Sequence, residues 1–183
     1  MTPVAELRSS VGRARLTVPR AADGLAHRLR VERALDGADP RSVRAGEILM
    51  VRRISGRLGS GAADGRRLGR DLESEVARIR DGAVRVAGPG DALPGADALL
   101  FTSFEALLLC LALDLAAGVQ GSRWYWREIA SLLGALPGTP GDLVVRWPDR
   151  APALLALAAR TGGLERLGAA ITEEEAAGAL GAL

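Results

Sequence analysis

The residue types that most often carry catalysis or bind a metal are scarce in this chain of 183 residues. His27 is its one histidine and Cys110 its one cysteine, so a Cys–His catalytic pair would have to consist of these two. A structural zinc site generally takes four Cys or His ligands. We therefore predict no metal site and no cofactor, and we expect Cys110 to be a buried, inert thiol because it lies in an apolar run.

The other reactive groups form no recognisable catalytic motif. The chain contains no lysine, which excludes phosphate-binding loops that need this residue and Schiff-base chemistry that needs a side-chain amine. Gly59-Ser60-Gly61 resembles part of a dinucleotide fingerprint, but no complete G-x-G-x-x-G accompanies it, so we interpret this segment as a flexible loop. The acids from Glu173 to Glu175 suit the first turn of a helix. We predict that the protein is not an enzyme. An enzyme that works through carboxylates and arginines is our third hypothesis.

The apolar pattern predicts a mainly α fold, a compact multi-helix domain with one or two short β-strands in its N-terminal half. The run from Ala106 to Ala117 is apolar nearly all round, which places it at the centre of the fold, and Thr102 or Ser103 is its expected N-cap. Residues 47–54 are the best strand candidate, with at most an edge strand at 16–18. Helical spacing covers residues 22–36, 64–81, 106–117, 122–136, 148–161, 164–170 and the segment from 172 onward.

Charge divides the chain into two unlike parts. Up to Arg85, 18 arginines stand against 11 acidic residues, a balance of +7, whereas the remainder has 6 against 11, a balance of −5. The stretch from Gly88 to Gly95 holds two prolines and three glycines and is the strongest break. We therefore expect a flexible tail over 1–20, a basic helix–strand–helix region over 21–87, a linker over 88–97 and a helical region over 98–183, with one shared core.

No segment is typical of a membrane span or a secretory signal. The longest apolar stretch, residues 98–119, is interrupted by Glu105 and Asp114, which leaves too short a run to cross roughly 30 Å of hydrocarbon. The first twenty residues have no continuous hydrophobic region. We expect a cytoplasmic protein without membrane insertion.

Three consecutive aromatic residues start the predicted helix over 122–136. They cannot all face one core, because successive helical residues are about 100° apart. Placing the apolar residues inward leaves Trp124 on the polar side, where it either covers neighbouring loops or anchors a partner, since Trp and Arg often dominate interfaces. As an anchor, Trp124→Ala would leave folding nearly intact and weaken association. The candidate partner-binding residues are Trp124, Arg123, Arg127, Arg52 and Arg53.

The arginine-rich first part keeps a second hypothesis open, which is nucleic-acid binding. Clustered positive charge is what phosphate contact needs. Against this hypothesis, the arginines alternate with acids, no recognition motif is visible, and the basic part has no aromatic residue for base stacking.

Several segments carry distinctive patterns of aliphatic and aromatic residues in a fixed order. These are Arg30 to Leu35 with Asp39-Pro40, Ile48 to Arg53, Leu100-Phe101 with Phe104 to Leu111, and Trp124 to Arg127. Their order resembles uncharacterised proteins encoded in gene clusters of extracellular contractile injection systems, the phage-tail-like secretion machines. The resemblance covers about residues 28–58 and 98–180 and implies an assembly accessory of the particle, with particle components as partners.

Overall fold

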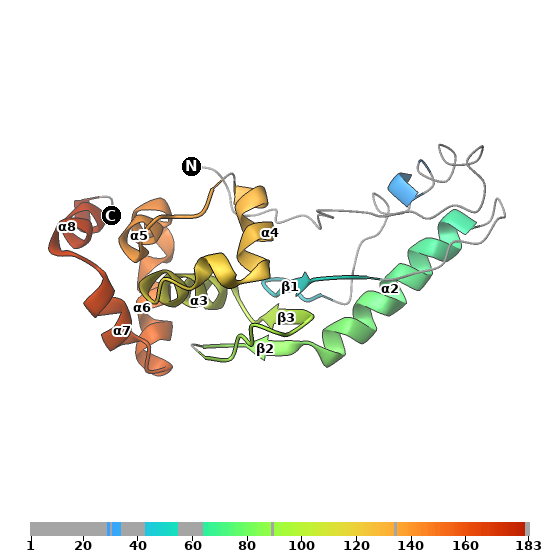
Figure 1. Cartoon of the computed structure of the whole chain (residues 1–183), viewed down its shortest axis with the longest axis horizontal. Helices are drawn as coiled ribbons and strands as arrows, with labels where there is room; N and C mark the ends of the chain where they lie inside the picture. Colours follow the sequence, from blue (N-terminus) through green and yellow to red (C-terminus); the bar gives the residue numbers. More distant parts are fainter. Residues whose placement is uncertain are drawn as a thin grey trace. The chain divides into compact units, whose positions relative to one another are not determined.

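The computed structural model describes residues 29, 31–33, 43–54, 64–88, 90–133 and 135–181, with only the backbone described for 64–66, 131–133 and 179–180 (Figure 1). The chain forms two compact units. One comprises residues 1–43 and 54–81, and the other comprises residues 44–53 and 82–183. In the described part helices predominate over strands, which confirms the predicted mainly α class.

The described part of the first unit consists chiefly of α2 (Asp64–Gly82), in agreement with the helix predicted over 64–81. Arg67 and Asp71 form the predicted pair one turn apart, with Nε and Oδ2 separated by 3.9 Å. Residues 29 and 31–33 are helical; the rest of the helix predicted over 22–36, the strand predicted at 16–18, and the tail lie outside the described residues. The apolar stripe of α2 is half-buried and consists of Leu68, Leu72, Val76 and Ile79.

The second unit contains a three-stranded sheet in the order β1-β3-β2. Strand β1 (Ile48–Val51) confirms the predicted strand and pairs antiparallel with β3 (Ala98–Phe101), whereas β2 (Val84–Val86) pairs parallel with β3. The central strand is buried throughout from Leu99 to Phe101, as its position between two neighbours requires. The sequence predicted one or two strands, and neither β2 nor β3 was among the segments predicted. The apolar run at 98–101 forms a strand rather than the approach to the next helix.

Residues 88–97 connect β2 to β3 inside the second unit, so the expected linker between two regions lies within one unit. Asp91 closes the first turn of this connection, because its Oδ2 accepts hydrogen bonds from the backbone N–H groups of Ala87, at 3.1 Å, and Gly88, at 2.9 Å. Gly88 is buried, and a Cβ placed on it would lie 2.9 Å from Cγ2 of Thr161. The connection is therefore packed against the unit at Gly88, whereas Gly90, Asp91 and residues 93–95 are exposed.

Helix α3 (Phe104–Ala116) lies at the centre of the second unit, as its apolar sequence predicted. Every residue from Ala106 to Leu113 is buried. Of the two expected N-caps, Ser103 has the role: its hydroxyl oxygen accepts a hydrogen bond from the backbone N–H of Ala106 at 3.1 Å. The helices that pack around α3 include α5 (Pro140–Arg146), α6 (Ala151–Arg160) and α7 (Leu164–Ala170) (Figure 1).

Helix α5 is absent from the elements predicted above. Its start carries a capping box, in which the Thr139 hydroxyl oxygen accepts from the Asp142 backbone N–H at 3.1 Å and Asp142 Oδ2 accepts from the Thr139 backbone N–H at 3.1 Å. The remaining elements are the 3₁₀ turn η3 (Gln120–Ser122), α4 (Trp124–Leu133), the 3₁₀ turn η4 (Pro148–Arg150) and α8 (Glu173–Gly181). Across the described ranges, no helix is both long and apolar enough to span a membrane.

The contact between α5 and α8 provides a test of this packing. Gly141 is buried against α8, and a Cβ added there would overlap Cβ of Glu175 and lie 2.6 Å from its Cγ. We expect Gly141→Ala to lower the free energy of unfolding by about 1–3 kcal/mol, because α8 must shift to admit the methyl group. Chemical denaturation followed by circular dichroism measures this change.

Gly178→Ala in α8 is the matched control, since nothing lies within 4 Å of the added Cβ. We expect it to raise the stability by up to about 1 kcal/mol, because alanine favours helix over glycine. Equal effects of the two substitutions would contradict the close approach of α5 to α8.

Candidate protein-binding surface

Trp124 begins α4 and lies against the connection that precedes β3. Its indole Nε1–H donates a hydrogen bond to the backbone carbonyl of Ala96 at 3.0 Å, and only 7% of the residue is exposed. Of the two alternatives that the sequence left open, the structure therefore shows the cover over a neighbouring loop. The indole is not exposed as an anchor would be, because the carbonyl of Ala96, 28 residues away, removes it from solvent. The helical pattern of the sequence carries no sign of this contact.

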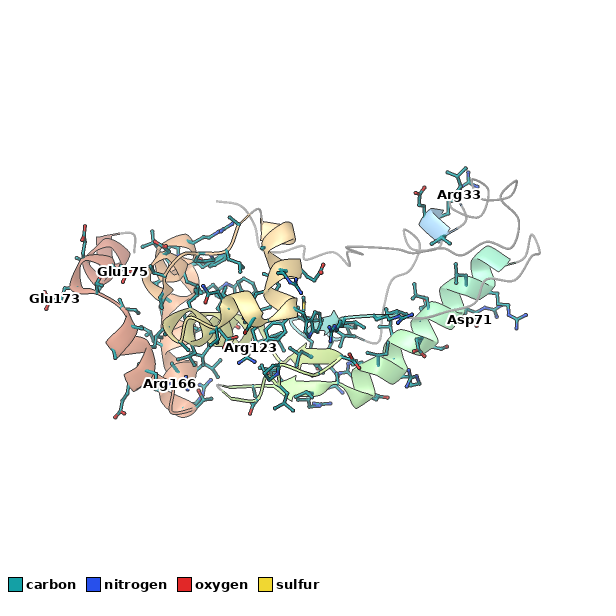
Figure 2. All side chains as sticks on the ribbon, in the orientation of Figure 1. Arg33, Asp71, Arg123, Arg166, Glu173 and Glu175 are labelled. Atoms are coloured by element: carbon teal, nitrogen blue, oxygen red, sulfur yellow. The ribbon has the colours of Figure 1, made fainter. Side chains whose placement is uncertain are left out.

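Asp114, near the end of α3, connects this helix to the turn before α4. Its Oδ2 accepts a hydrogen bond from Nε1–H of Trp126 at 2.8 Å and lies 3.5 Å from Nε of Arg123. Arg123 is labelled in Figure 2. The Arg123 side chain is only 18% exposed. Arg123 is thus engaged within the protein, and the guanidinium that the sequence assigned to a partner has an internal structural contact.

The aromatic residues of α4 pack on β3 and on one another. Tyr125 and Trp126 are fully buried, with their ring centroids 4.7 Å apart, and the Phe101 ring lies 6.4 Å from the first and 6.2 Å from the second. The pairs of Tyr125 with Phe101 and with Trp126 are edge-to-face, an arrangement that adds to the free energy gained from buried area. We call Asp114, Arg123, Trp124, Tyr125 and Trp126 the aromatic corner.

Burial keeps two weakly acidic groups neutral here, the Cys110 thiol beside the aromatic corner and the Tyr125 hydroxyl within it. Burial, and next the negative charge of Asp114, raises the pKa of the Cys110 thiol to about 12. The pKa of the Tyr125 hydroxyl is raised as well, first by burial and then by Cys110 and Asp114. Both groups are therefore neutral near pH 7, and the Cys110 thiol lacks the activation that a catalytic nucleophile needs. His27, its only possible histidine partner, lies outside the described residues.

Arg52 and Arg53 follow the end of β1 and have exposed side chains. The backbone N–H of Arg52 donates to the carbonyl of Asp97 at 2.8 Å. This carbonyl is next in the chain to that of Ala96, which accepts from Trp124. The structure thus brings together two regions that are more than seventy residues apart in the sequence. They meet at one pair of consecutive peptide groups.

Arg127 is exposed on α4 and stands three residues after Trp124, which places it on the same side of the helix. Within the described part of the chain, no hydrogen bond or ion pair engages the side chains of Arg52, Arg53 or Arg127. We call these three residues the arginine surface. Of the five candidate residues, the structure leaves these three accessible to a partner and buries or engages the other two.

An ion pair fixes the start of α3 against η4. Arg150 Nη1 donates to Glu105 Oε1 at 3.0 Å, across 45 residues of sequence. Burial is the largest influence on the pKa of Glu105 and raises it, but hydrogen bonds from its own backbone N–H, from Ser103 and from Arg150 together lower the pKa below the ordinary 4.5. The folded state therefore favours the charged carboxylate.

Sequence reasoning missed Asp114, which accepts the hydrogen bond of the Trp126 indole and forms an ion pair with Arg123. The available signal was its isolation, since a single acid inside an apolar helix needs hydrogen-bond donors near it. No signal identified the carbonyls of Ala96 and Asp97, because backbone acceptors carry no mark in a sequence. Among the residues that the structure describes, no group of three His, Cys, Asp or Glu side chains could hold a metal ion.

Comparison of the chain with protein-family models, with curated proteins and with solved structures finds no match.

The position of Trp124 predicts the effect of truncating it. We expect Trp124→Ala to lower the free energy of unfolding by about 3–5 kcal/mol, the range for a buried tryptophan, and Trp126→Ala to lower it by a similar amount. Trp124→Phe keeps an aromatic ring but loses the hydrogen bond and part of the buried volume, so it should cost about 1–3 kcal/mol. Thermal denaturation measures all three.

Arg127→Ala on the same helix is the control and should change the stability by less than about 0.5 kcal/mol. If Trp124→Ala matches this control, the indole does not hold α4 to the connection before β3.

The lowered pKa of Glu105 predicts a dependence of stability on pH. A carboxyl whose pKa is lower in the folded state stabilises the fold above its ordinary pKa of 4.5, and this contribution is lost as pH falls through the folded pKa. Glu105→Gln should therefore be less stable than wild type at pH 7, and the difference should shrink as pH falls below 4.5. We expect a difference below about 1 kcal/mol, because the Arg150 side chain is 41% exposed.

Urea denaturation at pH 7, 5, 4 and 3 measures the dependence, with Glu165→Gln on α7 as the control for removal of one carboxylate. A difference between wild type and Glu105→Gln that stays constant over this range would contradict the assignment.

Proposed function

We propose that this chain is a non-catalytic protein that binds other proteins, with the arginine surface as the contact for an acidic partner. The observation that carries the proposal is where three exposed arginines lie: the end of β1, with Arg52 and Arg53, and the start of α4, with Arg127, meet on the consecutive carbonyls of Ala96 and Asp97. Arg123 and Arg150 are held by Asp114 and Glu105. Arg52, Arg53 and Arg127 are exposed and engage no described side chain.

Exposed guanidinium groups without a side-chain partner suit a protein–protein interface. They bind carboxylates through two parallel hydrogen bonds, and arginine is enriched at the centres of interfaces while other charged residues are depleted there. An arginine already paired inside the protein would have to lose that contact first.

The aromatic corner supports the proposal by fixing the backbone under these side chains. The hydrogen bonds of Trp124 and Arg52 to consecutive carbonyls limit movement of α4 and of the end of β1. Binding then orders only the side chains, which reduces the entropic cost of association.

The particular role we propose is that of an assembly accessory of a contractile injection apparatus, acting in the cytoplasm. This version rests on the resemblance described for residues 28–58 and 98–180. Its expected partners are tube, sheath or baseplate proteins of a phage-tail-like particle.

Capture experiments with charge-matched variants test the proposal. The first variant carries Arg52→Glu, Arg53→Glu and Arg127→Glu. The control carries Arg44→Glu, Arg85→Glu and Arg166→Glu, which are also exposed positions of the second unit. We expect tagged wild type and the control to recover particle components from cells of the source organism. The first variant should recover at least about tenfold less, because each reversal removes an attraction and adds a repulsion. Quantitative mass spectrometry of the captured proteins measures the difference.

Capture of no tube, sheath or baseplate protein by the wild type would refute the injection-system role. Equal capture by the two variants would refute the arginine surface. Nucleic-acid binding is tested in parallel by titrating a 20-base-pair DNA duplex and a single strand at low and high salt. An affinity that falls steeply with salt and is lost in the first variant would favour the nucleic-acid alternative over the proposed function.

A further inference from the structure

Helix α6 is apolar on two opposite sides. One side faces the core, where Ala151, Leu154 and Ala158 are buried. From Ala151 to Ala159 the helix has no polar side chain, so its solvent side is apolar as well. A helix without a polar face is expected to be buried, because removing apolar surface from water lowers the free energy.

The solvent side has the spacing of a helix-packing stripe. Pro152, Leu155, Ala156 and Ala159 stand at positions i, i+3, i+4 and i+7, and all four are exposed, with Leu155 exposed by 42%. Scattered exposed leucines are ordinary in proteins, but a continuous apolar side on one helix marks an interaction site. Three of the four side chains are small enough for another helix backbone to approach closely. We call these four residues the outer stripe.

Charges at the two ends of α6 indicate what covers the outer stripe. Asp149 lies in η4, immediately before the helix, and its side chain is 76% exposed, with Oδ2 3.6 Å from Nε of Arg150. Arg160 ends the helix and is also exposed. A second α6 laid antiparallel on the first would bring the arginine end of each helix to the acidic end of the other. The two helix dipoles would also oppose each other favourably.

We propose that the outer stripe of α6 binds a second copy of this chain in a two-fold symmetric dimer. Pro152, Leu155, Ala156 and Ala159 of each copy pack on the same residues of the other, and Asp149 of each copy pairs with Arg160 of the other. This is the self-complementary arrangement that two-fold symmetry requires. The inference extends the proposed role in assembly by naming one partner, and it uses no residue of the arginine surface.

One helix of this length buries less than the roughly 800 Å² per partner of a standard interface, so we expect a dissociation constant in the micromolar range. Sedimentation of the full chain from about 1 to 300 µM spans that range. Ala156→Glu should raise the dissociation constant about 100-fold or more, because an unpaired carboxylate would be desolvated at the centre of the contact. Ala177→Glu, at an exposed position of α8, is the matched control and should dimerise like the wild type.

Two charge reversals test the antiparallel pairing itself. Asp149→Arg alone places arginine against arginine in a homodimer, and Arg160→Glu alone places two acids together, so each variant should dimerise at least about tenfold more weakly than wild type. An equal mixture of the two variants restores both opposite-charge pairs in the mixed dimer. The mixture should therefore associate within about threefold of the wild-type constant. Because the chain has no lysine, an amine-reactive dye on its N-terminus labels one variant at a single site, which identifies the mixed species.

A wild type that stays monomeric up to 300 µM would overturn the inference, whatever else the outer stripe binds. Unchanged dimerisation of Ala156→Glu, or a mixture no stronger than its components, would overturn it too. The triple variant of the arginine surface should still dimerise. Failure of the dimer and failure of the proposed partner contact are therefore separate results.

Discussion

Helix α3 must be covered on every side, and this requirement organises the second unit. Its sequence offers no face to water, so packing elements are needed around the whole circumference. Strand β3 lies on one part of it, and α5, α6 and α7 are among the helices that cover other parts. The covering helices are short, of seven to ten residues, and none would be stable alone in water. Their stability comes from the apolar surface that they remove from solvent together with α3.

The two polar groups on this central helix are used to position its neighbours. Glu105 at the N-terminal end binds Arg150, and Asp114 near the C-terminal end binds the Trp126 indole and lies near Arg123. Charged groups at a helix that is otherwise buried would be costly without such partners. Each carboxylate therefore selects one arrangement of the chain that follows it, which apolar contact by itself does far less strictly.

The sequence predicted those features that depend on local spacing. The amphipathic repeat of α2, the apolar run of α3 and the residues of α7 are all readable within one or two turns, and the structure confirms them. Strands β2 and β3 were missed because they are three and four residues long and acquire their identity only by pairing with distant segments. Trp124 was misplaced for a related reason, since its partner is a backbone carbonyl 28 residues away. Of the candidate binding residues, Arg52, Arg53 and Arg127 are exposed as a partner contact requires, and their function stays a prediction.

The pairing register of the sheet also has a topological consequence. Val51 lies opposite Ala98 and Val84 opposite Leu99, so the end of β1 and the start of β2 flank neighbouring residues of one strand. Two strand spacings separate them, which is roughly 10 Å. The chain between Val51 and Val84, which includes α2, therefore begins and ends at neighbouring positions of the sheet. The entropy of closing such a connection changes slowly with its length. The segment between β1 and β2 can therefore vary in size over evolution, while the sheet and the helices around α3 keep their geometry.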